Sequence, residues 1–85
     1  MSPLGLKLGK AILRWQETER AVLDAHEQDA RDGGWVAVDA AREAHRITTR
    51  LYAEVWREWV AAGNEWSPLI RMVLEQVAQA AEESS

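Results

Sequence analysis

The sequence predicts an all-α fold made of a long antiparallel helical hairpin and a shorter third helix. Apolar residues recur every three to four positions through most of the chain, which is the period of one helix face. Helix start and stop signals divide the 85 residues into three segments. Strand-like alternation is not sustained, and its one candidate, residues 35–38, runs straight into a helical pattern. A chain of 85 residues is expected to form a single domain, residues 1–85.

The first helix is expected over residues 3–32. Ser2 precedes Pro3, and a serine N-cap followed by proline at the first helical position is a common start signal. Gly33 and Gly34 follow Asp32, and glycine tolerates the left-handed conformation that ends many helices. One face at spacings of three and four collects the apolar residues Leu4, Leu8, Ala11, Ile12, Trp15, Val22 and Ala25.

The second helix is expected over residues 35–62 and ends before Gly63 and Asn64. Because only two glycines separate it from the first helix, the two must form an antiparallel hairpin. Its apolar face contains Val38, Ala41, Ala44, Thr48, Leu51, Tyr52, Val55, Trp56 and Trp59.

The third helix is expected over residues 68–83, again after a serine and a proline, Ser67 and Pro68. We expect it to turn back along the second helix and to cover the end that holds most of the tryptophans. The pattern assigns to its buried side Trp66, Leu69, Ile70, Val73, Val77 and Ala80. It assigns to its outer side Arg71, Glu75, Gln79 and Glu82.

Three helices of these lengths leave apolar surface uncovered. Ala40, Ala44, Ile47 and Leu51 widen the apolar arc of the second helix beyond a single seam. Leu6 and Leu13 point away from the face of Leu8 and Trp15. Uncovered apolar surface of this kind is typical of proteins with a partner. We therefore expect a homodimer in which the hairpins complete a helical bundle.

The residues assigned to a protein interface are Trp35, Tyr52, Trp56 and Arg57, with Leu6 and Leu13. Tryptophan, tyrosine and arginine are the types enriched at binding hot spots. The competing interpretation is that the aromatic residues simply fill the core of a chain that has no phenylalanine. That interpretation is favoured for Trp15, Tyr52 and Trp59, which lie in the middle of their stripes.

An alternative function is suggested by a row of arginines on the second helix, Arg42, Arg46, Arg50 and Arg57. Such a row can follow a phosphate backbone. Pairs such as Arg50–Glu54 and Glu27–Arg31 would neutralise it, so the alternative depends on whether Arg42, Arg46 and Arg50 are free. The basic stretch with Lys7, Lys10 and Arg14 could lie in a lipid interface, but the favoured interpretation is packing of the helix end against a second chain.

His26, His45 and Glu19 are expected on the inner faces of the hairpin. The favoured interpretation is a polar layer that fixes helix register, with a possible pH-sensitive histidine–carboxylate pair. A metal site needs three or four convergent ligands, and the pattern does not supply them. No metal and no cofactor are expected.

No enzyme signature is present: the chain has no cysteine, no glycine-rich phosphate loop and no activated hydroxyl. The net charge of −4 disfavours general nucleic-acid binding. Lys7 and Lys10 interrupt any signal-peptide core, and no stretch is long enough to span a bilayer, so a cytoplasmic protein is expected. The predicted function is a small non-catalytic interaction module: an adaptor, an assembly factor, or an inhibitor such as an antitoxin or a phage-encoded anti-host protein.

Overall fold

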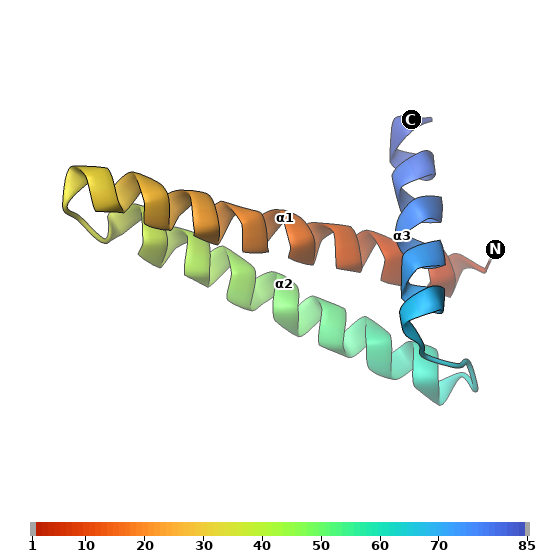
Figure 1. Ribbon diagram of the computed structural model, residues 1–85. Helices are drawn as coiled ribbons and strands as arrows, with labels where there is room; N and C mark the ends of the chain where they lie inside the picture. The colour runs from red at the N-terminus through yellow and green to blue at the C-terminus, as the bar shows by residue number, and fades with distance from the viewer. Residues whose placement is uncertain (1, 85) are drawn as a thin grey trace.

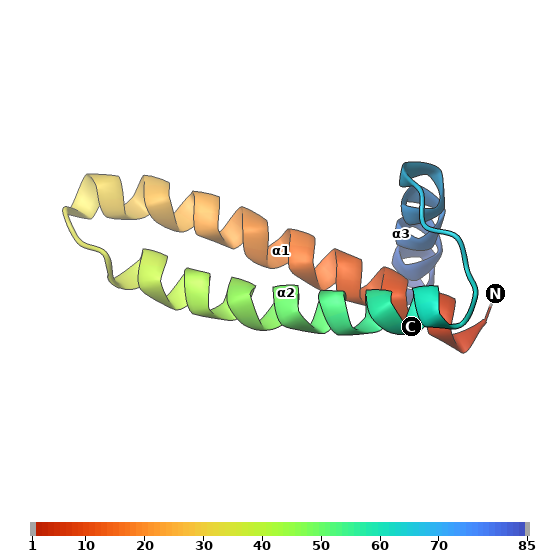
Figure 2. The same ribbon diagram turned by 90° about the horizontal axis from the view of Figure 1, so that it is seen from below.

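The computed structural model describes residues 2–84 and folds them into three helices (Figure 1). The helices are α1 (Pro3–Asp32), α2 (Val36–Ala61) and α3 (Pro68–Glu83). The all-α hairpin with a third helix is thereby confirmed. The bounds of α1 and α3 are those predicted, and α2 begins and ends one residue inside the predicted range. In both views α1 and α2 run side by side, and α3 crosses the N-terminal half of α1 (Figures 1 and 2).

The predicted capping residues adopt their expected roles. The Ser2 side chain accepts a hydrogen bond from the backbone N–H of Gly5, and the Ser67 side chain accepts one from Ile70, each at 3.2 Å. Gly33 has a φ of 76°, and its N–H donates to the Asp29 carbonyl at 2.7 Å. That left-handed conformation ends α1 and starts the reversal of the chain.

The start of α2 is capped by a side chain that belongs to α1. Its own N-cap residue, Trp35, makes no side-chain cap. Instead, the Asp29 carboxylate accepts a hydrogen bond from the backbone N–H of Val38 at 2.9 Å. Asp29 is only 8% exposed, and Val38 is fully buried. The carboxylate therefore satisfies a free helix donor, lies at the positive end of the α2 dipole and ties the two helices together at the turn.

The hydrophobic core lies at the other end of the hairpin, where all three helices meet. Its buried residues come from every helix: Leu8, Ile12, Val55, Trp59 and Leu74. Trp59 also donates from Nε1 to the Glu65 carbonyl at 2.8 Å, which holds the loop between α2 and α3 against the core. Trp59 is thus a core residue, as its position in the middle of the stripe predicts.

The prediction that the third helix lies along the second is wrong, because α3 packs its backbone against α1. The third helix packs against α1 because the two helices cross at small residues, Gly9 of α1 and Ala78 of α3. A side chain at Gly9 would overlap the carbonyl oxygen of Leu74, and its Cβ would lie 2.9 Å from the Cβ of Ala78. The missing side chain at Gly9 therefore lets the two backbones approach closely.

The buried face of α3 is rotated from the one predicted. Leu74 and Ala78 are buried, whereas Leu69 and Val73 are 64% and 42% exposed. Arg71 and Glu75, which were expected to face outward, are half-buried toward α1. The side-chain amide of Gln16 donates to the Glu75 carboxylate at 2.9 Å, and Arg71 donates to the same carboxylate at 2.9 Å. The sequence pattern is ambiguous here because α3 has apolar residues on nearly every side.

Candidate functional site

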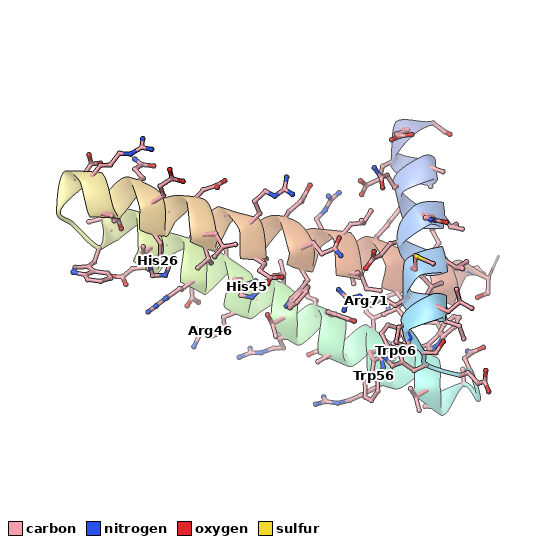
Figure 3. All side chains as sticks on the ribbon, in the orientation of Figure 1. His26, His45, Arg46, Trp56, Trp66 and Arg71 are labelled. Carbon is pink, nitrogen blue, oxygen red and sulfur yellow. The ribbon has the colours of Figure 1, made fainter. Side chains whose placement is uncertain are left out.

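An aromatic cluster lies where α2 meets the start of α3. The rings of Trp15, Tyr52, Trp66 and Trp56 follow one another at centroid separations of 5.8, 6.3 and 6.4 Å. Together with Thr49 and Ala53 these rings line an open hollow of about 340 Å³, called the aromatic hollow below, whose lining atoms are almost all apolar. Figure 3 shows Trp56 and Trp66 together beside the start of α3, with Arg71 nearby.

The indole N–H groups of the cluster are not equally satisfied. Trp15 donates from Nε1 to the Thr49 hydroxyl at 3.0 Å. Nε1 of Trp56 is buried and has no acceptor among residues 2–84. A buried donor without an acceptor lowers the stability of the folded chain, and such groups are uncommon in native structures.

Threonines and His45 form the polar layer between α1 and α2. The Thr18 hydroxyl lies 3.0 Å from Nδ1 of His45 and 2.6 Å from the Thr48 hydroxyl. Glu19 and His26, the partners expected for His45, are both exposed. The inner-face position predicted for Glu19 and His26 is therefore wrong, and His45 contacts a threonine hydroxyl instead of a carboxylate. Within residues 2–84, no three histidine, aspartate or glutamate side chains are placed to hold a metal ion.

Tyr52 is the residue of the cluster whose ionisation is perturbed. Burial raises the pKa of the Tyr52 phenol above its ordinary value of 10.0. The Arg71 charge opposes this shift, and the Glu75 charge adds to it. The folded chain therefore favours the neutral phenol, in keeping with its apolar surroundings.

This shift predicts a loss of stability at high pH. Because the folded pKa is raised, the folded state holds its phenolic proton at a pH where the unfolded state has lost it. The free energy of unfolding should therefore fall as the pH rises above 10 and through the folded pKa. Denaturant unfolding of the wild type and of Tyr52→Phe at pH about 9 and about 11 should show the steeper fall in the wild type. Equal slopes would show that Tyr52 ionises freely.

A groove with a row of arginines continues along the hairpin from the aromatic hollow. This arginine groove has a volume of about 710 Å³. Its lining residues are Val22 of α1 and, from α2, Arg42, His45, Arg46, Thr49, Arg50, Ala53 and Arg57. Figure 3 shows His45 and Arg46 along this part of the hairpin, between His26 and the aromatic cluster.

Within residues 2–84, three of the four arginines in the groove have no acidic partner. Arg46 pairs with Glu43 at 2.8 Å and remains 69% exposed at the side chain. Arg42, Arg50 and Arg57 form no ion pair among the described residues. The predicted Arg50–Glu54 pair is not formed, whereas the Glu27–Arg31 pair is formed at 2.9 Å. The groove is thus less neutralised than the spacing of charges suggests.

The other flank of α2 carries an exposed apolar stripe. Val36, Ile47 and Leu51 are 84%, 54% and 51% exposed. Ala40 and Ala44 lie between them at helical spacing and are exposed as well. We call these five residues the apolar stripe. Beside it, Leu51 borders a small hollow with Lys7, Lys10, Ala11 and Arg14 of α1.

The residues predicted for a protein interface do not form one surface. Tyr52 and Trp56 are half-buried in the aromatic cluster, and Arg57 is exposed at the end of the arginine groove. Trp35 is 66% exposed at the hairpin turn. It lies about 30 Å along α2 from Trp56 and Arg57, at 1.5 Å per residue. Trp35 is therefore separate from the other candidates.

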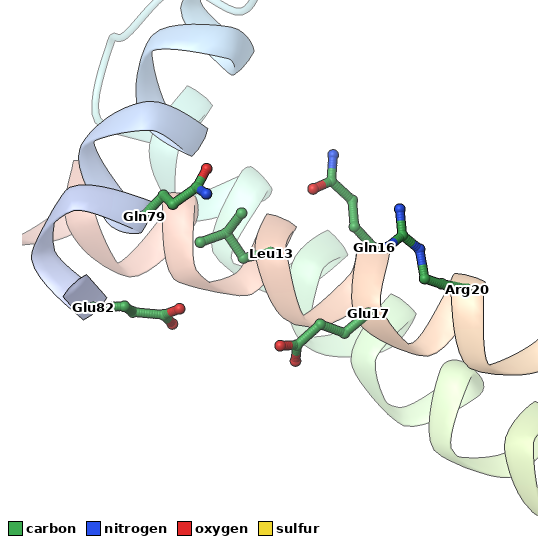
Figure 4. Close-up of a pocket in the computed structure, with 6 residues that line it drawn as sticks. All are labelled: Leu13, Gln16, Glu17, Arg20, Gln79 and Glu82. Carbon is green, nitrogen blue, oxygen red and sulfur yellow. The ribbon is translucent and has the colours of Figure 1, made fainter.

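Leu6 and Leu13 are half-buried on α1. Leu13 borders a hollow of about 350 Å³ between α1 and the end of α3, where Gln79 and Glu82 approach it (Figure 4). The remaining lining residues, Gln16, Glu17 and Arg20, are polar. The third helix thus provides some of the cover that a second chain was expected to supply for Leu13.

The basic N-terminal stretch is built into the fold. Leu8 and Ile12 are fully buried, and Gly9 makes the contact with α3. Lys7 pairs with Glu58 at 3.2 Å, and Arg14 pairs with Glu17 at 3.1 Å. None of the helices within residues 2–84 combines the length and the apolar character needed to cross a bilayer.

Comparisons with protein families, with curated proteins and with solved structures give no match.

Proposed function

We propose that this protein is a small, non-catalytic helical interaction module that acts by binding another protein in the cytoplasm and that associates as a homodimer through α2. The observation that carries the proposal is the exposed apolar stripe, with Val36, Ile47 and Leu51 each more than half exposed. Burying apolar surface stabilises association by about 25 cal/mol per Å². A module of this kind suits an adaptor, an assembly factor, or an inhibitor such as an antitoxin or a phage-encoded anti-host protein.

A dimer interface would take only a small share of the exposed surface of the chain. A standard interface takes about 800 Å² from each partner. That area is about a seventh of the 5919 Å² that this chain exposes. Two hairpins that pair along their α2 stripes would form a bundle of four long helices, an arrangement with short loops and a continuous apolar centre.

Light scattering over micromolar to millimolar concentrations tests the self-association. The wild type should have twice the 9.6 kDa mass of the chain. The double variant Ile47→Glu, Leu51→Glu should return to the mass of one chain, because it places charges in the stripe. Leu23→Glu is the matched control, since Leu23 is 65% exposed on α1 outside the stripe. A wild type that stays at the mass of one chain throughout would refute the dimer.

The second candidate is a nucleic-acid or membrane-surface binder that uses the arginine face. The observation in its favour is that Arg42 and Arg50 have no carboxylate partner among the described residues. Binding of the basic N-terminal stretch to a membrane surface is less well supported. Leu8 and Ile12, which would have to contact the lipid, are buried in the core. Binding to heparin that disappears with modest salt, and that Arg42→Glu abolishes, would favour this candidate.

A further inference from the structure

We infer that the arginine groove and the aromatic hollow together form one binding site for a short acidic segment of a partner protein that carries a large apolar side chain. Thr49 and Ala53 line both, so the two are continuous along α2. This inference rests on one part of the proposed function, namely that the protein acts by binding another protein. It does not require the homodimer. The site uses the flank of α2 opposite the apolar stripe, so each surface can be tested without the other.

The charge of the groove selects for carboxylates. No aspartate or glutamate lines it, and Arg42, Arg50 and Arg57 have no acidic partner among the described residues. This local positive charge stands out in a chain whose net charge is −4. Guanidinium groups bind carboxylates through two parallel hydrogen bonds, which is stronger and more directional than a lysine contact.

The length of the row matches a short segment. From Arg42 to Arg57 the helix rises about 22 Å. An extended chain covers that distance in about seven residues. Asp39 lies about one turn before the first arginine on the same flank of α2. An acidic side chain thus bounds the positive row at its N-terminal end.

The aromatic hollow supplies the place for the apolar side chain. Its lining is almost entirely apolar, and it opens beside the end of the arginine row. Trp56, whose indole N–H has no acceptor in residues 2–84, is one of its walls. Tryptophan, tyrosine and arginine are the residue types enriched at binding hot spots.

A protein segment fits this site better than a nucleic acid. A duplex or a long single strand would continue past the four arginines and meet Asp39 at the N-terminal end of the row. Only a few phosphates would then be neutralised, and affinity for nucleic acid depends on that number. A short acidic peptide ends before it reaches the repulsive Asp39 side chain.

NMR titration of the full-length protein with defined probes tests the inference. The probe is a peptide of about seven residues, six glutamates followed by one leucine, which matches the length of the row. Two control peptides replace the glutamates by glutamine or the leucine by alanine. The fourth probe is a single-stranded oligonucleotide of similar length. The signals observed are the tryptophan indole N–H groups and the arginine Nε–H groups, which report the two halves of the site separately.

The expected result is saturable binding of the acidic peptide, with shifts of the Trp56 indole and of Arg42 and Arg50. The double variant Arg42→Glu, Arg50→Glu should weaken binding by about tenfold or more. Arg20→Glu is the control, because Arg20 is an exposed arginine of α1 outside the groove. It should change the affinity by less than about twofold.

Three outcomes would overturn the inference. They are no saturable binding of the acidic peptide at millimolar concentration, an equal loss of affinity in Arg20→Glu, and tighter binding of the oligonucleotide than of the peptide. The last outcome would assign the groove to the second candidate function. None of them changes the molecular mass of the wild type, so a failure here is distinguishable from a failure of the dimer.

Discussion

Replacing Gly9 by valine is expected to separate α3 from α1 and to lower the free energy of unfolding by about 3 kcal/mol. The new side chain would occupy the position of the Leu74 carbonyl and press on Ala78. A carbonyl oxygen in a helix cannot turn away as a flexible side chain can, so the whole helix must shift. Leu74 would then leave the core that it shares with Leu8 and Ile12.

The matched control is Ala21→Val, which also adds valine to α1 but at an exposed position. This variant should lower the free energy of unfolding only by the difference in helix propensity between alanine and valine, about half a kcal/mol. Denaturant unfolding followed by tryptophan fluorescence measures both variants. Gly9→Ala sharpens the test: at an exposed site it would stabilise a helix by about 1 kcal/mol, whereas here its Cβ meets Leu74 and it should destabilise. Equal stability of Gly9→Val and Ala21→Val would show that the crossing is not close.

Replacing Asp29 by alanine is expected to lower the free energy of unfolding by about 1–2 kcal/mol. The variant removes the acceptor for the Val38 N–H at a buried position, and Trp35 offers no substitute cap. The first turn of α2 should therefore fray. Hydrogen exchange of the Val38 amide should accelerate together with the loss of global stability.

Two further variants separate the cap from a general charge effect. Asp24→Ala removes an exposed carboxylate of α1 that pairs with no cation in residues 2–84, and it should have little effect. Asp29→Asn keeps an oxygen acceptor and should recover part of the stability. If Asp24→Ala and Asp29→Ala destabilise equally, Asp29 does not act as a cap.

Local signals were sufficient to predict the helices. Ser2, Ser67 and Gly33 act through backbone hydrogen bonds within a few residues, so their effect can be read from the sequence alone. The long apolar periodicity of the hairpin likewise identifies Leu8, Ile12 and Val55 as core residues. Trp59 follows from the same pattern.

The placement of α3 could not be predicted because it depends on a contact between residues 65 positions apart. Gly5 and Gly9 show the spacing of a close helix crossing, but that spacing does not say which helix approaches. On α3, Leu69 and Val73 satisfy the helical period as well as Leu74 and Ala78 do. The close approach at Gly9 selects the second pair.

The site was predicted in part. Tyr52, Trp56 and Arg57 do border the groove and the hollow, but Trp35 lies at the far end of the hairpin. Arg50 and Glu54 have the spacing of an ion pair but do not form one. The spacing only allows the two side chains to meet, and an exposed ion pair is too weak to hold them together. The tertiary role of Asp29 gives no sequence signal, since the donor that it satisfies is nine residues away.

An isotope-filtered NMR experiment on an equimolar mixture of labelled and unlabelled chains tests the dimer directly. If a second copy covers the apolar stripe, the methyl groups of Ile47 and Leu51 should show intermolecular contacts to the other chain. The exposed methyl groups of Leu23 on α1 should show none. Ile47 and Leu51 methyl groups that contact only their own chain at millimolar concentration would contradict a dimer formed through the apolar stripe.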